Sequence, residues 1–210
     1  MSEPTMRSPL HSFGLGEQAK PIDNSSGVWA NEIPYLGYIS LRGNAADPGF
    51  LTAASTALGV SLPLRPCTLT SVNGSTILWL SPDEWMVVCP RAQLSALLGS
   101  LRHALTDVRS QVVDNSGGYT QVILEGRHAL DVLQHVSVYD FASMEPGRVV
   151  GTTFGKSSAY AFRQGEGYRL VIRRSFADYI WRYLVRAATP YGLGIADLGG
   201  SRRIEEEAAT

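Results

Sequence analysis

Two short polar segments of the sequence combine carboxylates with turn-forming residues, and chemistry is most conceivable there. They are Ser81-Pro82-Asp83-Glu84-Trp85 and Asp114-Asn115-Ser116-Gly117-Gly118. Each lies beside an apolar run, so we expect both at strand ends, where sheet proteins place ligand contacts. Turns also select Asp, Asn, Ser and Gly for local reasons, because their side chains bond the backbone and glycine accepts positive φ. A purely structural role is therefore the simpler interpretation of both segments.

Other residues with chemical potential lack the neighbours that a site needs. Cys67 and Cys89 are expected in strands of the first half of the chain, as reduced core thiols without further ligands at metal-binding spacing. The histidines are scattered over the N-terminal segment and two helices, at His11, His103, His128 and His135. The glycine-rich stretch Gly192–Gly200 follows a predicted helix and precedes none, which is the wrong context for a phosphate loop. We therefore predict no catalytic residue, no cofactor-binding residue and no metal ligand in this chain.

The overall composition excludes several classes of protein. The chain has 210 residues, of which 44% are hydrophobic and 18% charged, with a formal net charge of −1. Such a balance is typical of a globular protein and provides no bulk attraction for nucleic acid or an anionic membrane. The sequence contains no run of about eighteen apolar residues and no apolar leader after its first charges. A cytoplasmic protein is expected.

A repeat with a constant offset organises the chain. Gly43 and Gly126 each stand between an expected strand and an expected helix, and they are 83 positions apart. Further pairs of like chemical type share this offset: Pro63 and Pro146, Trp79 and Phe162, Trp85 and Tyr168, Val88 and Val171, Arg91 and Arg174, Leu97 and Ile180, and Leu101 and Leu184. So many matches without a gap indicate the duplication of a half-domain of about eighty residues.

The duplication predicts a single pseudo-symmetric domain over residues 29–189, with halves at about 29–106 and 111–189. An irregular arm (1–28) would precede this domain, and a C-terminal tail (190–210) would follow it.

Hydrophobic periodicity predicts the same order of elements in both halves. The first half is expected to hold strands within Val28–Leu41, a helix after Asp47-Pro48, strands at Cys67–Val72, Thr76–Leu80 and Glu84–Val88, and a helix opened by Pro90. The second is expected to hold strands within Val112–Leu124, a helix at Arg127–Val136, strands at Val149–Phe154, Ala159–Arg163 and Tyr168–Ile172, and a final helix opened by a capping box from Ser175 to Asp178. The predicted class is α+β.

Several segments carry a resemblance to a known family. They are Leu78–Val88, Asp114 and Ser116 before Tyr119, Leu124–Gly126, Ala129–Leu133, Tyr168–Ile172, and Arg174–Ala177 with Trp181. In these segments the chain resembles the gamma subunits of bacterial heterotetrameric sarcosine oxidase, and the resemblance as a whole spans roughly residues 29–188. Many relatives have a Lys-Gly-Cys-Pro-like segment where this chain has Gln134–Val138. That departure leaves open a paralogous complex, such as N-methylglutamate dehydrogenase.

The resemblance implies an α+β fold of duplicated β2-α-β3-α units, similar to the folate-binding domain of aminomethyltransferase (the glycine-cleavage T-protein). It implies a non-catalytic gamma subunit with a structural role in assembly, partnered by alpha, beta and delta subunits. The complex would oxidatively demethylate sarcosine with tetrahydrofolate and O2 to glycine, 5,10-methylenetetrahydrofolate and H2O2. FAD, FMN and NAD would lie in the alpha and beta subunits, the tetrahydrofolate site in alpha, and zinc in delta.

A stand-alone folate-binding or aminomethyltransferase-like one-carbon protein is the alternative. Such a protein would need an acid for the pterin ring and an open cavity between the two halves. Asp83, Glu84 or Asp114 could supply that acid.

The final predicted helix carries more aromatic surface than one sheet requires. Its large side chains, which cover more than one face, are Phe176, Tyr179, Ile180, Trp181, Tyr183 and Leu184. The positions 83 residues before Tyr179 and Trp181 are only Ala96 and Leu98. We expect some of this surface, with Trp29 and the arm around Phe13, to contact a larger partner subunit. Packing of the same side chains in an asymmetric core of the chain itself is the alternative.

Overall fold

The structure is a computed structural model that describes residues 6–199. The chain divides into two compact units, each built around one β-sheet. One unit comprises Leu36–Tyr119 and Gly147–Val150, and of the described residues the other comprises 6–35, Thr120–Pro146 and 151–199.

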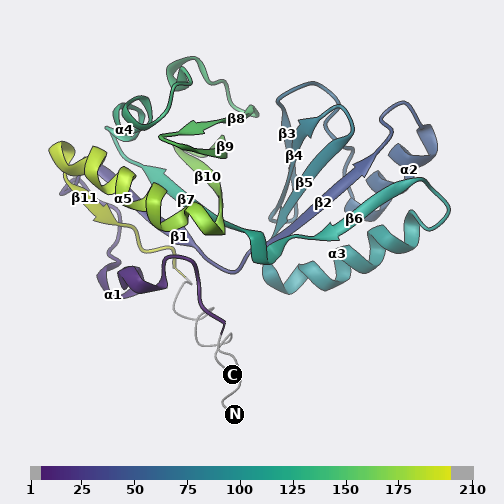
Figure 1. The fold of residues 1–210 in the computed structure, drawn as a ribbon, viewed down its shortest axis with the longest axis horizontal. Coiled ribbons are helices and arrows are strands. Elements are labelled where there is room, and N and C mark those ends of the chain that lie inside the picture. The colour runs from purple at the N-terminus through teal and green to yellow at the C-terminus, as the bar shows by residue number, and fades with distance from the viewer. Residues whose placement is uncertain (1–5, 200–210) are drawn as a thin grey trace, which may run out of the picture. The chain divides into compact units, whose positions relative to one another are not determined.

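The 36–119 unit contains a five-stranded antiparallel sheet in the order β3-β4-β5-β2-β6 (Figure 1). Its elements are β2 (Gly37–Gly43), α2 (Pro48–Leu58), β3 (Leu69–Val72), β4 (Ser75–Ser81), β5 (Glu84–Cys89), α3 (Arg91–Ala104), β6 (Ser110–Asp114) and the short helix η2 (Ser116–Gly118). The predicted start of α2 is confirmed, because the Asp47 carboxylate accepts a hydrogen bond from the Gly49 N–H at 2.8 Å. The predicted strands Cys67–Val72 and Thr76–Leu80 correspond to β3 and β4, which pair as a hairpin whose turn includes Asn73 with a φ of 49°.

Alternate residues of this sheet form a core with the two helices. Ile39 and Leu41 on β2 and Trp85 and Val87 on β5 are fully buried, as the period of two in a strand requires. The helices supply further large residues to this core, which are Phe50, Leu58, Leu94, Leu98 and Leu101. A close approach accompanies this packing, because a Cβ on Gly43 would lie 2.2 Å from the Phe50 ring.

The second unit contains a six-stranded sheet in the order β11-β1-β7-β10-β9-β8. Its elements are η1 (His11–Phe13), α1 (Leu15–Gln18), β1 (Val28–Ile33), β7 (Tyr119–Glu125), α4 (Ala129–Val136), η3 (Phe141–Ser143), β8 (Val149–Phe154), β9 (Ser157–Gln164), β10 (Gly167–Arg173), η4 (Arg174–Phe176), α5 (Ala177–Ala188), η5 (Thr189–Tyr191) and β11 (Leu193–Ile195). The long helix of this unit, α5, buries Ile180, Trp181 and Leu184.

Equivalent strands occupy equivalent places in the two sheets, which confirms the α+β class and the repeated order of elements. In each sheet, however, one of the two neighbours of β2 or β7 comes from the other half of the chain. β6 pairs antiparallel with β2, and β1 pairs antiparallel with β7. The first strand of each half therefore joins the sheet of the other half. The predicted single domain over 29–189 and the packing of its halves as symmetric mates stay predictions.

Two local predictions of element boundaries are wrong. Cys67 lies before β3 rather than in it, with a φ of 58° in the left-handed region, so it belongs to a turn. Ser175 does not cap the last helix, because Arg174–Phe176 forms a 3-10 turn and α5 begins at Ala177 without a side-chain cap. Asp178 binds the Arg182 guanidinium one turn later, with an Nε–Oδ1 distance of 2.8 Å.

The stretch predicted as a C-terminal tail contributes a strand. Residues Leu193–Ile195 pair in parallel with β1, with Val28 opposite Leu193 and Ala30 opposite Ile195. This pairing satisfies the outer edge of β1, which would otherwise expose unpaired N–H and C=O groups. The predicted charged end of the tail, Arg202, Arg203 and Glu205–Glu207, lies outside the described residues.

Candidate functional site

The turn containing Asp83 is held by local bonds. One carboxylate oxygen of Asp83 accepts from the Ser81 hydroxyl at 2.8 Å, and the other accepts from the Arg42 guanidinium at 2.8 Å. Ser81 and then Arg42 lower the pKa of Asp83 below its usual value. The ion pair is about half exposed, with side-chain accessibilities of 47% and 54%. These contacts close the β4–β5 turn and fasten it to β2.

The segment after β6 is likewise organised by its own polar groups. The Asp114 carboxylate accepts from the Ser116 N–H at 2.9 Å, and the Ser116 hydroxyl accepts from the Tyr38 N–H at 3.0 Å. The amide of Asn115 donates to the Ser40 hydroxyl at 2.6 Å. Partial burial alone would raise the pKa of Asp114, but the hydrogen bonds from Ser116 lower it overall. The segment thus fastens the end of β6 to β2.

The predicted candidate acids do not come together. Asp114 lies opposite Ile39, whereas Glu84 lies opposite Arg42, on the two sides of β2. Three residues along a strand separate these positions by about 10 Å. A hollow of about 580 Å³ beside Asp83 includes Arg42 but not Asp114. Within this unit the acids therefore form no paired-carboxylate site, and a folate-binding role for any of them stays a prediction.

The thiols occupy different environments. Cys89 is buried in the core of the 36–119 unit, and burial, followed by the charge of Asp114, raises the pKa of its thiol to about 11. Cys67 is partly exposed, so its assignment as a core thiol is wrong. Both cysteines are free. His128 stacks on the ring of Tyr191, and its Nδ1 lies 2.7 Å from the Asp131 carboxylate.

Two searches of the described structure bear on cofactor and membrane binding. Over residues 6–199, no three His, Cys, Asp or Glu side chains are placed to share a metal ion. No helix within the same range is long and apolar enough to cross a bilayer.

The aromatic residues expected at a partner interface are largely internal. Trp181 and Trp29 are each only 2% exposed. The Phe13 ring lies 6.2 Å from that of Trp181, and the Arg182 guanidinium lies 5.0 Å from the centre of the Phe13 ring. The prediction that Trp181, Trp29 and Phe13 face a partner is therefore wrong for the two tryptophans. The arm packs on its own unit, where Phe13 lies against Trp181 of α5.

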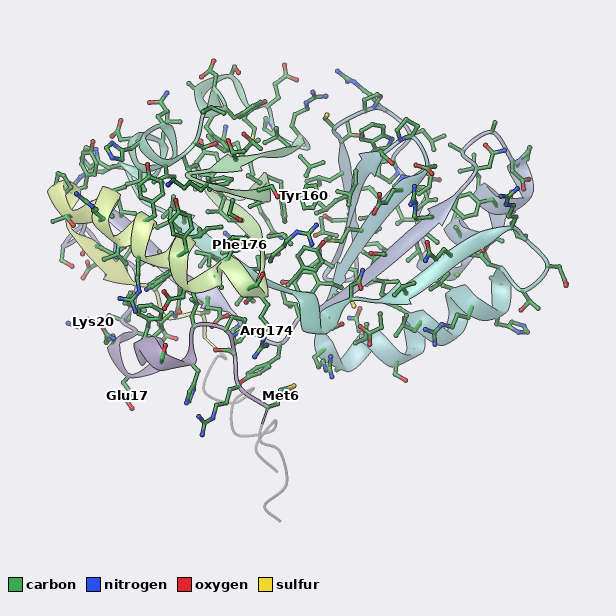
Figure 2. All side chains as sticks on the ribbon, viewed as in Figure 1. Met6, Glu17, Lys20, Tyr160, Arg174 and Phe176 are labelled. Carbon is green, nitrogen blue, oxygen red and sulfur yellow. The ribbon has the colours of Figure 1, made fainter. Side chains whose placement is uncertain are left out.

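A buried carboxylate that sequence reasoning missed ties the arm to the sheet. Glu32 on β1 is 5% exposed, and it accepts from the Thr120 hydroxyl at 2.6 Å and from the Leu10 N–H at 3.3 Å. Burial raises the pKa of Glu32 despite these bonds. Arg174 also donates to the main-chain oxygen of Arg7 at 2.8 Å, beside the arm in Figure 2. A charged residue inside the apolar strand VWANEI was the signal available in the sequence.

Part of the predicted aromatic surface does remain accessible. Phe176 is 42% exposed and Tyr179 is 38% exposed. The Tyr179 hydroxyl accepts from the Lys156 N–H at 3.1 Å. A partner contact for these two residues stays a prediction, as does the non-catalytic character of the chain.

Comparisons with known proteins agree with this arrangement. The model of the sarcosine oxidase gamma subunit family matches residues 42–190. Sarcosine oxidase subunit gamma of Corynebacterium sp. (strain U-96) is 28% identical, over 88% of this chain and 91% of the relative. The heterotetrameric sarcosine oxidase from Corynebacterium sp. U-96, solved with pyrrole 2-carboxylate, contains a chain with a TM-score of 0.80 and 26% identity. That likeness covers 89% of this chain and 96% of the other.

A more distant likeness concerns the fold alone. The glycine cleavage system aminomethyltransferase T from Bartonella henselae has a TM-score of 0.65 at 15% identity, over 88% of this chain and 57% of the other. The two sheets and their repeated order are thus shared with an aminomethyltransferase, while the family match covers most of the sequence. The chain belongs to the sarcosine oxidase gamma subunit family.

Proposed function

We propose that this chain is the non-catalytic gamma subunit of a heterotetrameric sarcosine oxidase and that it acts in assembly. The observation that carries the proposal is the structural likeness to a chain of such an oxidase, which extends over 96% of that chain with a TM-score of 0.80. Likeness over almost the whole length supports a subunit of the same kind rather than a shared domain in an unrelated protein. Its partners would be the alpha, beta and delta subunits, and the complex would be cytoplasmic.

The proposed complex is an oxidoreductase that acts on the CH–NH group of sarcosine with O2 as acceptor. It would convert sarcosine, tetrahydrofolate and O2 to glycine, 5,10-methylenetetrahydrofolate and H2O2. FAD, FMN, NAD and zinc would be held by the other subunits. The separation of Asp83 and Glu84 from Asp114, and the local bonds that occupy Asp83 and Asp114, support a chain without a catalytic role of its own.

The fold favours a second candidate. The likeness to aminomethyltransferase T is compatible with a folate-binding or one-carbon-transfer protein that works alone. The departure at Gln134–Val138 leaves a third possibility in the same class as the first, the equivalent subunit of N-methylglutamate dehydrogenase.

Co-expression with the alpha, beta and delta subunits of the same organism, with an affinity tag on alpha, tests the proposal. We expect the chain to co-purify in constant proportion and the complex to produce H2O2 from sarcosine. Turnover of N-methylglutamate instead would assign the chain to the paralogous complex. Titration of the isolated chain with tetrahydrofolate is the second measurement, and micromolar binding there would favour the stand-alone protein.

A further inference from the structure

A groove runs along α5 in the unit that contains the arm. It has a volume of about 650 Å³, and three elements form it. The floor consists of Trp181 and Val185, which are four residues apart on one face of α5, and of Thr189, which directly follows the helix. One wall is the arm, through Phe13 and Leu15, and the other is β11, through Leu193 and Ile195.

Main-chain bonds hold the two walls of the groove together. The Lys20 N–H donates to the oxygen of Ile195 at 2.9 Å, and the Asp197 N–H donates to the oxygen of Lys20 at 2.8 Å. Leu15 is buried, and Trp181 is 2% exposed beneath the groove, whereas Val185 is 37% exposed. The groove is therefore a built feature with an accessible apolar floor.

The duplicated fold does not require this groove. On α3, the helix equivalent to α5, the positions 83 residues before Val185 and Arg186 are Arg102 and His103, and both are exposed. The 36–119 unit has β6 at the edge of its sheet, with no described strand in the place that β11 takes beside β1. The arm and β11 thus add a surface to one half only, outside the repeated elements.

The rim of the groove is basic. Arg182 and Arg186 line it, and none of the described residues lining it is acidic. Arg182 is paired with Asp178, at 2.8 and 3.2 Å, and covers the Phe13 ring. Arg186 is exposed, and over residues 6–199 it takes part in no ion pair. A carboxylate brought to this rim would find a guanidinium with its donors available.

We infer that this groove docks an extended segment of the large partner subunit in which an apolar side chain stands next to a carboxylate. The apolar side chain would lie on Val185 between Phe13 and Leu193, and the carboxylate would pair with Arg186. This arrangement combines an apolar centre with a charged rim, as protein interfaces do. The inference rests on the proposed function, because it assigns the docking surface of that same subunit.

Variants that reverse the charge of the rim or place a charge on the apolar floor test the inference in the co-purification assay. Arg186→Glu and Val185→Asp should each reduce the amount of chain recovered on tagged alpha at least tenfold. Arg102→Glu, the matched charge reversal at the position on α3 equivalent to Val185, should leave recovery unchanged. Far-UV circular dichroism melts of the isolated variants serve as the control for folding, since both target side chains are exposed.

The outcomes separate the inference from the function on which it rests. Failure of the wild-type chain to co-purify would reject the proposed function and the inference with it. Co-purification of wild type and of both groove variants alike would overturn the inference alone. A variant with a melting temperature well below that of wild type would be replaced by Val185→Lys, which removes the apolar floor and keeps the rim basic. Undiminished recovery of Val185→Lys on tagged alpha would overturn the inference too.

Two other occupants are distinguishable in the same system. The chain's own sequence from Ile204 to Glu207 also combines an apolar residue with carboxylates. Binding of a synthetic 201–210 peptide to a chain truncated after Gly199, abolished by Arg186→Glu, together with undiminished recovery on alpha, would assign the groove to that segment and overturn the partner. A wild-type dimer in size-exclusion chromatography that Val185→Asp converts to monomer would assign it to a second copy and likewise overturn the partner.

Discussion

Replacement of Trp181 by alanine should destabilise the isolated chain rather than detach it from a partner. The indole is 2% exposed on α5 and lies 6.2 Å from the Phe13 ring. An aromatic side chain buries about 150–250 Å², which at about 25 cal/mol per Å² corresponds to about 4–6 kcal/mol. Measured losses for Trp→Ala in protein cores are about 3–5 kcal/mol, and we expect a value in that range. The loss would be a large fraction of the about 5–15 kcal/mol that stabilises a typical domain.

Urea unfolding followed by far-UV circular dichroism measures this effect without relying on tryptophan emission. With a slope of about 1–3 kcal/mol per M, the midpoint for Trp181→Ala should fall by roughly 1–5 M. Tyr179→Ala is the matched control on the same helix. Because Tyr179 is 38% exposed and makes one main-chain hydrogen bond, its loss should cost about 1 kcal/mol. A Trp181→Ala chain as stable as wild type, yet unable to join its partner subunits, would refute the core assignment and restore the interface.

Three further changes test the arm, the thiols and the close packing of the 36–119 unit. Burial raises the pKa of Glu32 above its ordinary value of 4.5, so wild type should lose stability as the pH rises through that raised pKa, and Glu32→Gln should remove this loss. The measurement is the urea midpoint of each protein at about pH 5 and at about pH 8. A gap between the wild-type and Glu32→Gln midpoints that is the same at both pH values would contradict the expectation. Ellman's reagent should modify Cys67 in the folded chain, whereas Cys89, with a pKa of about 11 and 1% exposure, should react only in denaturant, and rapid modification of both would exclude the assigned burial. Gly43→Ala should destabilise the chain by about 1–3 kcal/mol, because its Cβ would lie 2.2 Å from a ring carbon of Phe50 on α2. Gly99→Ala in α3, which has open space around it, should stabilise the chain by about 0.5–1 kcal/mol. Thermal melts compare the two variants, and equal effects would argue against the close approach at Gly43.

Local order in this protein could be predicted from the sequence because it depends on neighbouring residues. The strand pattern within Val28–Leu41 and the helix start at Asp47-Pro48 each act over a few positions, and each predicted its element. The offset between Gly43 and Gly126 added the duplication, since related halves repeat the same periodicities. The resemblance to the gamma subunit family came from motifs of the same local kind, such as the turn that precedes Trp85.

The candidate acids show where local patterns stop being informative. Asp83 and Asp114 had the composition of a ligand-binding turn and also that of an ordinary turn. Their separation along β2 depends on the register of β5 and β6 with that strand, which no local signal specifies. The buried Glu32 was visible as a charge in an apolar strand, but its partners, Thr120 and Leu10, come from distant parts of the chain.

Only the tertiary structure decided which edges the strands join and what covers the last helix. β1 and β6 have the same local character in either sheet, and their exchange between the two sheets depends on pairing between residues far apart in the chain, such as Trp29 with Glu125 and Ile39 with Asp114. An aromatic stripe containing Trp181 has the same sequence pattern whether a partner or the chain's own arm covers it. In this structure the arm covers it, since the Phe13 ring lies against Trp181 and the Glu32 carboxylate accepts from the main-chain N–H of Leu10 in the arm. Such a balance of burial and hydrogen bonding is a property of the folded chain, and the periodicity of its sequence does not contain it.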